Sequence, residues 1–138
     1  MKGEKTMRGD FGAYINEKRK GRGPGGGDVL LRDLAKAMGD MSVSYLSDII
    51  KGRRNPPDIK LLEIIAKELK LTPDEKAQMF DLAGRERDEA APDLPGYIMD
   101  ENLPHVRVAL RKATKKGLGD DFWKHVAEEI DKHGDFNE

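Results

Sequence analysis

The stretch from Leu31 to Pro57, LRDLAKAMGDMSVSYLSDIIKGRRNPP, decides the fold, because two short amphipathic segments meet there at a tight turn. The first segment carries one apolar stripe at helical spacing, made of Leu31, Leu34, Ala35 and Met38. Gly39 follows this stripe and predicts the end of the helix, because glycine enters the left-handed cap conformation at little steric cost. The sequence therefore predicts a short helix followed by a sharp turn.

A second short helix is predicted directly after that turn, with Ser42 as its N-cap. Its inward face has apolar residues at helical spacing: Leu46, Ile49 and Ile50. Its outward face is small and polar: Val43, Ser44, Ser47, Asp48 and Lys51. Such a face fits the major groove of DNA, and the basic residues beside it, Lys51, Arg53 and Arg54, suit phosphates.

These residues resemble a family, the Cro/CI-type or XRE-like helix-turn-helix DNA-binding proteins of phage repressors and bacterial regulators. The resemblance is carried by both predicted helices, the basic segment and the next helix: Leu34-Ala35 to Gly39, Ser42, Leu46-Ser47, Ile49, Gly52 to Pro56, Leu61-Leu62, Ile65-Ala66 and Leu69. It implies a compact bundle of about five helices. Two departures stand out. The segment GRGPGGG (21–27) with Asp28 precedes the first helix of the motif, and Ile50 stands where the family usually has an acid.

The polar face and the resemblance together predict which residues contact DNA. We expect base contacts from Val43, Ser44, Tyr45, Ser47 and Asp48. We expect phosphate contacts from Arg22, Lys51, Arg53, Arg54 and Asn55. Asp48 argues against this assignment, because a carboxylate in the groove repels phosphate unless it accepts from a cytosine amino group. The alternative interpretation is an ordinary wet helix face, or a surface that binds another protein.

Further helix signals surround the motif. An N-terminal helix is expected to include Phe11, Tyr14 and Ile15 and to end at the glycine run. Asp58 suits the N-cap of a later helix, and Thr72-Pro73-Asp74-Glu75 has the pattern of a capping box with proline at the first helical position. The sequence thus predicts an all-α protein, with a five-helix Cro/CI-type bundle over residues 8–90.

A proline-rich linker over residues 91–103 and a two-helix extension over residues 104–138 are expected to follow the bundle. The first helix runs from Pro104 to Lys116, and the second begins with Asp120 as its cap and carries an apolar stripe of Phe122, Trp123, Val126 and Ile130. Forty residues cannot bury much core alone, so these helices must pack on the bundle or on another subunit. We expect a homodimer, because helix-turn-helix proteins commonly read two half-sites across a two-fold axis.

The composition places limits on the function. The 138 residues carry a net charge of −1, but seven basic and three acidic residues lie between Lys2 and Arg22, whereas nine acids and three bases lie between Asp74 and Glu101. Since physiological salt screens charges that lie more than about 8 Å apart, the acidic segment does not exclude DNA binding by the basic one. No apolar run approaches the roughly 20 residues of a membrane span and no signal peptide is evident, so we expect a cytoplasmic protein without membrane contact.

Other motifs are weaker. Residues 21–26 match G-x-G-x-x-G, but no strand is predicted before them, so we expect a flexible loop or a basic arm rather than a cofactor site. His105, His125 and His133 lack metal-ligand spacing, and the absence of cysteine excludes thiolate catalysis and cysteine-bound zinc. We therefore expect no metal, no cofactor and no enzymatic activity.

These observations predict a sequence-specific DNA-binding transcriptional regulator, a repressor that works by occupying double-stranded DNA. The alternative is a protein-interaction module, such as an antitoxin or a phage-encoded inhibitor, that uses its helices to cover a protein partner. A small enzyme is the third and weakest interpretation, because no nucleophile, base or metal set is clustered in the sequence.

Overall fold

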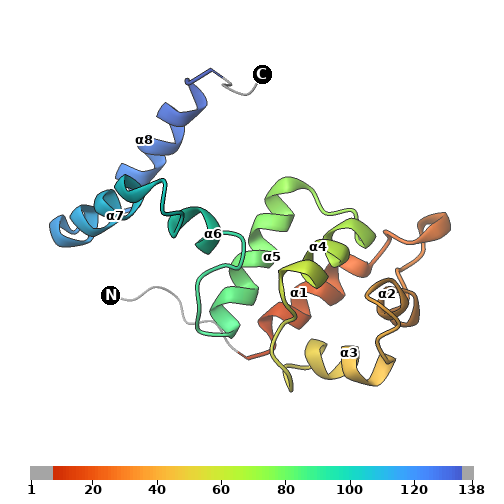
Figure 1. The fold of residues 1–138 in the computed structure, drawn as a ribbon. Coiled ribbons are helices and arrows are strands. Elements are labelled where there is room, and N and C mark those ends of the chain that lie inside the picture. Colours follow the sequence, from red (N-terminus) through yellow and green to blue (C-terminus); the bar gives the residue numbers. More distant parts are fainter. Residues whose placement is uncertain (1–7, 135–138) are drawn as a thin grey trace. The chain divides into compact units, whose positions relative to one another are not determined.

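The computed structural model describes residues 8–134, and these form eight α-helices, one short 3-10 turn and no strand. The chain divides into two compact units between Pro95 and Gly96 (Figure 1). The prediction of an all-α fold is confirmed. The last four residues of the predicted C-terminal extension, 135–138, lie outside the described part of the chain, as do residues 1–7.

The first unit contains five helices. They are α1 (Asp10–Arg19), α2 (Leu31–Ala37), α3 (Val43–Ile50), α4 (Ile59–Glu68) and α5 (Pro73–Glu86). The predicted caps are present, because the side chains of Ser42 and Asp58 accept hydrogen bonds from Tyr45 N and Leu61 N at 3.0 and 3.2 Å. Thr72 and Glu75 form the complete capping box at the start of α5.

The core of this unit lies between the five helices. Its largest fully buried side chains are Phe11, Ile15, Leu34, Leu46, Ile49, Leu62, Ile65, Leu69, Met79 and Pro56. The apolar stripes predicted for α2 and α3 therefore face inward, although Leu31 is only half-buried. The turn between α2 and α3 contains Gly39 with φ +97°, which is the left-handed conformation that glycine adopts most easily.

The first helix approaches the end of α3 so closely that only glycine fits between them. A Cβ added to Gly12 would lie 1.8 Å from the backbone oxygen of Ile50. Ile50 is 8% exposed and belongs to the core. The apolar residue at position 50, one of the two departures from the family pattern, is thus covered by α1.

The glycine-rich segment before α2 forms a closed loop with a 3-10 turn, η1 (Pro24–Gly26). Val29 N donates to Arg19 O at 2.9 Å, and Arg19 Nη1 donates back to Val29 O at 2.6 Å. Gly21 N donates to Asp28 Oδ1 at 3.0 Å. These bonds join the two ends of the loop, so the chain re-enters the bundle at the point where α1 ended.

The second unit begins within the short α6 (Pro95–Ile98) and contains α7 (Pro104–Lys116) and α8 (Asp120–Asp131). The sequence patterns predicted α7 and α8 but not α6. Arg107 Nη1 donates to the backbone oxygens of Ile98 and Asp100, which fastens the segment after α6 onto α7. The prediction that Asp120 caps α8 is wrong, because Gly119 occupies the N-cap and Asp120 is the first helical residue. Between residues 8 and 134, no helix combines the length and apolar character that a membrane crossing requires.

Candidate nucleic-acid interface

The outer face of α3 presents the residues predicted to contact bases. Ser44, Ser47 and Asp48 lie at the centre of this face by helical spacing, with Val43 and Tyr45 at its two edges. Val43 and Tyr45 are 44% and 41% exposed, whereas the inward residues Leu46, Ile49 and Ile50 are buried. The structure therefore brings the five predicted base-contacting residues onto the outward side of one helix, where Ser47 and Asp48 are partly buried, and the core packs against the other side.

The loop after α3 carries the predicted phosphate contacts. Lys51, Arg53 and Arg54 are all exposed, and the side chains of the two arginines are 65% and 52% accessible. The backbone N–H groups of Arg53 and Arg54 donate to Asp48 O at 2.8 and 3.3 Å, which continues α3 into the loop. The basic residues consequently follow the outer face of α3 without a break.

Asp48 is paired with both arginines of this loop. Arg53 Nη1 lies 3.3 Å from its Oδ1, and Arg54 Nε lies 3.8 Å from its Oδ2. The two guanidinium groups balance the carboxylate charge, so the repulsion that Asp48 would exert on a phosphate is reduced. This pairing answers the main objection to Asp48 at the DNA-facing side of α3.

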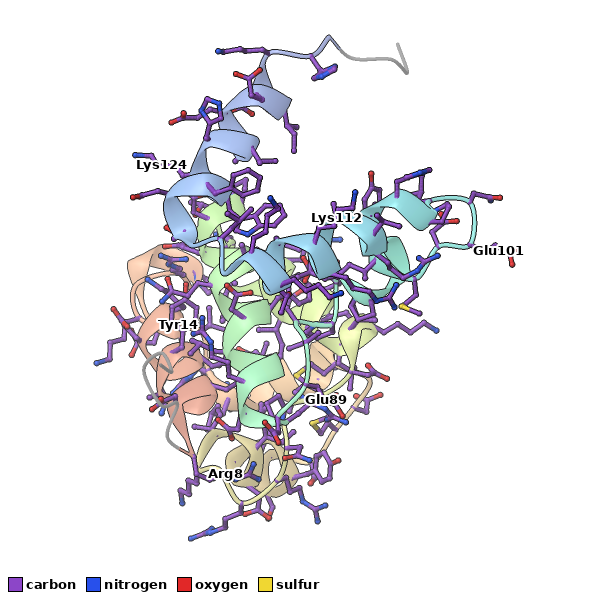
Figure 2. The ribbon with its side chains drawn as sticks, turned by 90° about the vertical axis from the view of Figure 1, so that its left-hand side faces the viewer. Arg8, Tyr14, Glu89, Glu101, Lys112 and Lys124 are labelled. Atoms are coloured by element: carbon purple, nitrogen blue, oxygen red, sulfur yellow. The ribbon has the colours of Figure 1, made fainter. Side chains whose placement is uncertain are left out.

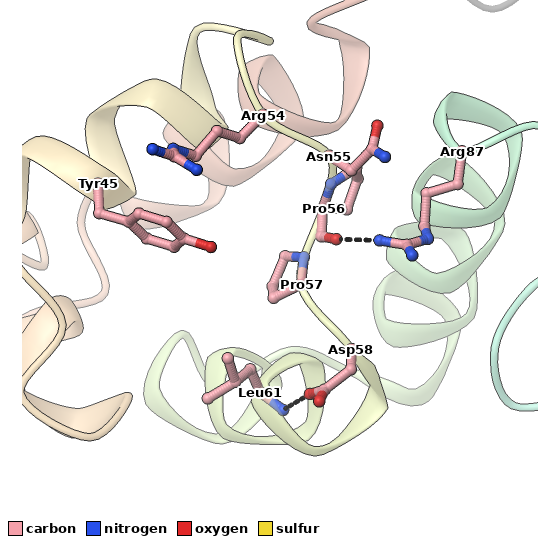
Figure 3. Close-up of a pocket in the computed structure, with 8 residues that line it drawn as sticks. All are labelled: Tyr45, Arg54, Asn55, Pro56, Pro57, Asp58, Leu61 and Arg87. Atoms are coloured by element: carbon pink, nitrogen blue, oxygen red, sulfur yellow. Dashed lines mark hydrogen bonds between the residues drawn. The ribbon is translucent and has the colours of Figure 1, made fainter.

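Tyr45 and Arg54 form a stacked pair at the edge of the same surface. The Arg54 guanidinium carbon lies 4.4 Å from the centre of the Tyr45 ring, the geometry of a cation–π contact. Both side chains line a hollow of about 450 Å³ (Figure 3). The other residues of its wall are Asn55, Pro56, Pro57, Asp58, Leu61 and Arg87. The Tyr45 ring therefore packs against the Arg54 guanidinium at the edge of the outer face of α3.

Asn55 is held in place by an arginine that sequence reasoning missed. Arg8 Nη1 donates to Asn55 Oδ1 at 2.9 Å, and Arg8 Nε donates to Gly52 O at 3.0 Å. The same Nη1 also donates to Glu86 O at 3.3 Å. Arg8 therefore ties the loop after α3 to the end of α5.

Glu86 completes this network by capping α1. Its Oε1 accepts hydrogen bonds from Gly9 N and Phe11 N, each at 3.2 Å. Its Oε2 is buried without a hydrogen bond and lies 3.9 Å from Arg8 Nη1. A carboxylate at this position satisfies orphan N–H groups at the start of α1, which has no capping side chain of its own.

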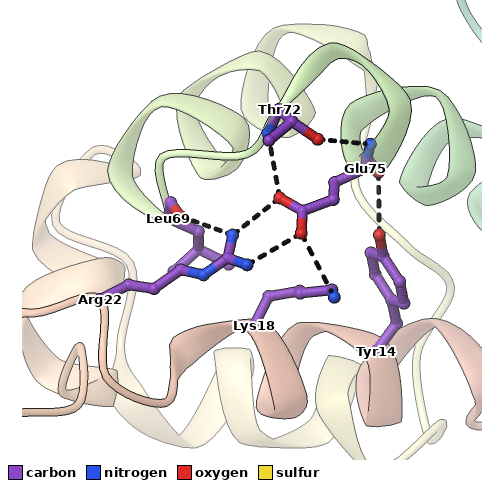
Figure 4. Close-up of polar contacts among 6 residues, drawn as sticks. All are labelled: Tyr14, Lys18, Arg22, Leu69, Thr72 and Glu75. Atoms are coloured by element: carbon purple, nitrogen blue, oxygen red, sulfur yellow. Dashed lines mark hydrogen bonds and ion pairs between the residues drawn. The ribbon is translucent and has the colours of Figure 1, made fainter.

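Arg22, predicted to contact phosphate, has a different position in the structure. Its Nη1 and Nη2 donate to the two carboxylate oxygens of Glu75 at 2.9 and 2.8 Å, and Nη1 also donates to Leu69 O (Figure 4). Lys18 Nζ approaches the same carboxylate at 3.4 Å. Both terminal nitrogens of the guanidinium hold the glycine-rich loop against α5, so we remove Arg22 from the proposed DNA contacts.

The pKa of Glu75 falls far below its ordinary range. The Arg22 hydrogen bond is the largest cause, followed by the backbone N–H of Thr72, and the hydrogen bond with Lys18 acts in the same direction. Glu75 also raises the pKa of Tyr14, second to the effect of burial. Tyr14 OH donates to Glu75 O at 3.1 Å, so α1, the loop and α5 meet at this one residue.

Among residues 8–134, no three His, Asp or Glu side chains gather as a metal site requires.

A family model described as Helix-turn-helix matches residues 29–76, which span α2, α3, α4 and the first turn of α5. No curated protein and no solved structure matches the chain. The matched residues contain the exposed surface described above except Arg87 in the wall of the hollow and the anchors Arg8 and Glu86. Residues 29–76 are therefore an XRE-like helix-turn-helix domain, a type of domain that binds DNA.

Proposed function

We propose that this protein is a sequence-specific transcriptional regulator that represses by occupying an operator. The observation that supports this most strongly is the juxtaposition of a polar outward helix face with two exposed arginines: the exposed Ser44 and the partly exposed Ser47 on α3, then Arg53 and Arg54. An α-helix fits the major groove, where each base pair presents a distinct pattern of donors and acceptors. A helix with short side chains on its outer face can approach those base edges closely.

Each residue of the surface has a separate role in this proposal. Ser44 and Ser47 contact base edges, and Val43 meets a thymine methyl group. Lys51, Arg53 and Arg54 contact phosphates, which fixes the orientation of the domain without reading sequence. Asp48 holds the two arginines in place, or accepts from a cytosine amino group when they turn to the backbone. Tyr45 orients Arg54, and Asn55 keeps the loop attached to Arg8.

Selection of binding sites from a random double-stranded DNA library, at two salt concentrations, tests this proposal. The wild-type protein should enrich a defined motif. The double variant Arg53→Ala/Arg54→Ala should lose enrichment, because it removes two phosphate contacts and lowers the salt dependence of binding. A matched control is Lys60→Ala/Lys67→Ala, which removes two exposed positive charges from α4.

The outcomes of the selection separate the possibilities. A motif that both the wild type and the control enrich, and that the arginine variant does not, supports sequence-specific recognition through the loop after α3. Binding that is sensitive to salt but enriches no motif would contradict sequence specificity. A reporter gene placed behind the selected motif then tests repression, since occupancy of an operator should reduce its expression, whereas an increase would contradict a repressor role.

A further inference from the structure

The second unit exposes apolar residues along both of its long helices. Phe122 and Ile130 on α8 are 41% and 64% exposed, and Leu110 on α7 is 37% exposed. Among the described residues of these helices, Ala113 alone is buried. Both helices are amphipathic, and an apolar stripe on such a helix is the surface that normally packs against another element.

A hollow of about 280 Å³ lies at the elbow between α7 and α8. Its wall consists of Leu110, Ala113, Thr114, Gly117, Leu118 and Trp123, and the surface it exposes is polar and apolar in nearly equal parts. The rings of Phe122 and Trp123 pack edge to face with their centres 5.0 Å apart, so Trp123 points into the elbow region while Phe122 stays accessible. An apolar side chain from a partner would fill this hollow and bury its walls.

The two helices carry opposite charge. The thirteen residues of α7 include five cations and no acid: Arg107, Arg111, Lys112, Lys115 and Lys116. The twelve residues of α8 include five acids and one lysine: Asp120, Asp121, Glu128, Glu129 and Asp131, with Lys124. Figure 2 draws these side chains along the two helices, with Lys112 and Lys124 labelled. Two consecutive helices of the second unit are therefore basic and acidic, respectively. The basic α7 of one copy is electrostatically complementary to the acidic α8 of another copy.

We infer that this surface binds a second copy of the chain, with the basic α7 of each copy beside the acidic α8 of the other. In a two-fold dimer every contact occurs twice, so one surface must supply both members of each pair. Pairing α7 with α7 would place five cations against five, and pairing α8 with α8 would oppose acids. Electrostatic complementarity therefore selects the crossed arrangement, while the apolar stripes supply the buried area.

Four charged residues flank the apolar stripes at helical spacing and are the ones to test. They are Lys112 and Lys116 on α7, and Glu129 and Asp131 on α8. Lys112 and Lys116 make no ion pair with any residue between 8 and 134, whereas Glu129 lies near His125 of its own helix and near Lys132 directly after that helix. Arg107 is left unchanged, because it holds the backbone oxygens of Ile98 and Asp100.

The inference is tested by charge reversal in the full-length protein, with mass measured by sedimentation in the absence of DNA. The wild type should form a dimer. Lys112→Glu/Lys116→Glu should reduce the positive charge of α7 and place new carboxylates opposite the acids of α8, and Glu129→Lys/Asp131→Lys should neutralise α8 and place new lysines opposite the cations of α7, so each variant alone should dimerise about tenfold more weakly. An equal mixture of the two variants should recover the dimer, because the new carboxylates on α7 of one variant then lie opposite the new lysines on α8 of the other. The control Lys60→Glu/Lys67→Glu reverses two exposed charges on α4 and should dimerise as the wild type does.

Three results would overturn the inference. A wild type that stays monomeric over the accessible concentrations would mean that the bundle of the same chain, or a foreign protein, covers this surface. Variants that dimerise as strongly as the wild type would show that these charges do not lie at the interface. Weak variants whose mixture stays weak, with helix content unchanged by circular dichroism, would exclude the crossed pairing. Because DNA is absent throughout, none of these results depends on the proposed function.

Discussion

Arg22 and Glu75 form a two-point ion pair, with N···O distances of 2.9 and 2.8 Å across a sequence separation of 53 residues. The pair fastens the glycine-rich loop to the first turn of α5. Arg22, which the sequence predicted to contact phosphate, therefore stabilises the bundle instead. The glycine-rich segment that departs from the family pattern packs against the bundle through this pair.

The Glu75 pair predicts a component of acid sensitivity. Because the folded protein holds the pKa of Glu75 below the ordinary value of 4.5, its stabilising effect is complete above that pH and is lost as the pH falls through the folded value. Glu75→Gln should lower the melting temperature at neutral pH, and the difference from the wild type should shrink as the pH falls below 4.5. Glu68→Gln, an exposed change on α4, is the control for thermal unfolding followed by circular dichroism. A difference that stays constant down to about pH 2 would contradict the role of this carboxylate.

The close approach of α1 to α3 predicts an unusual response to alanine. Gly12→Ala should lower the melting temperature by at least about 5 °C, because the added methyl group meets the backbone oxygen of Ile50 and the helices must separate. Helix propensity alone would give the opposite sign, about 1 kcal/mol in favour of alanine. Ala13→Gly on the exposed side of the same helix measures that propensity effect. Unchanged or increased stability of Gly12→Ala would show that the two helices are not in contact at this point.

The stacking of Tyr45 and Arg54 predicts that the two side chains act together on DNA. Tyr45→Ala and Arg54→Ala should each weaken binding to the selected site, and the double variant should lose less than the sum, with a coupling of about 0.5–1 kcal/mol. Tyr45→Phe keeps the ring and should bind nearly as the wild type does. Fluorescence anisotropy with labelled duplex provides the four affinities. If the losses of binding free energy from Tyr45→Ala and Arg54→Ala were fully additive, the Tyr45 ring would contribute to DNA binding without orienting Arg54.

Arg8 is expected to position the loop after α3. Arg8→Ala removes its hydrogen bonds to Gly52 O and Asn55 Oδ1, so DNA binding should weaken by roughly three- to tenfold while the salt dependence stays unchanged. A residue that itself contacted phosphate would instead lower the slope of log K against log salt by about one. Arg85→Ala, which removes an exposed charge from α5, is the matched control. A lowered slope for Arg8→Ala would reassign this residue to the DNA contact set.

Local signals account for what the sequence could predict. Capping residues and apolar stripes lie within three or four positions of one another, so Ser42, Asp58 and Thr72 marked their helices correctly. Asp48 is also close in sequence to Arg53 and Arg54, at separations of five and six residues. No general spacing rule predicts ion pairs at such separations across the end of a helix. Asp120 was misplaced by one position, because Gly119 could take the cap without a side chain.

Long-range contacts account for what the sequence could not predict. Arg8 is 47 residues from Asn55 and 78 from Glu86, and no spacing pattern relates positions that far apart. Whether an arginine meets a phosphate or a carboxylate depends on which helices pack together, as the Arg22 pair shows. The short helix α6 was missed because four residues with a proline and a glycine carry too little periodicity to distinguish from a linker.

The most direct test of the central proposal, that the outer face of α3 reads base edges, is repetition of the DNA selection with Ser47→Ala. Loss of one hydrogen-bonding side chain should change the preferred base at one position of each site, while affinity for unrelated DNA and its salt dependence stay as in the wild type. An unchanged motif, or an equal loss of affinity for every sequence, would contradict recognition through this face.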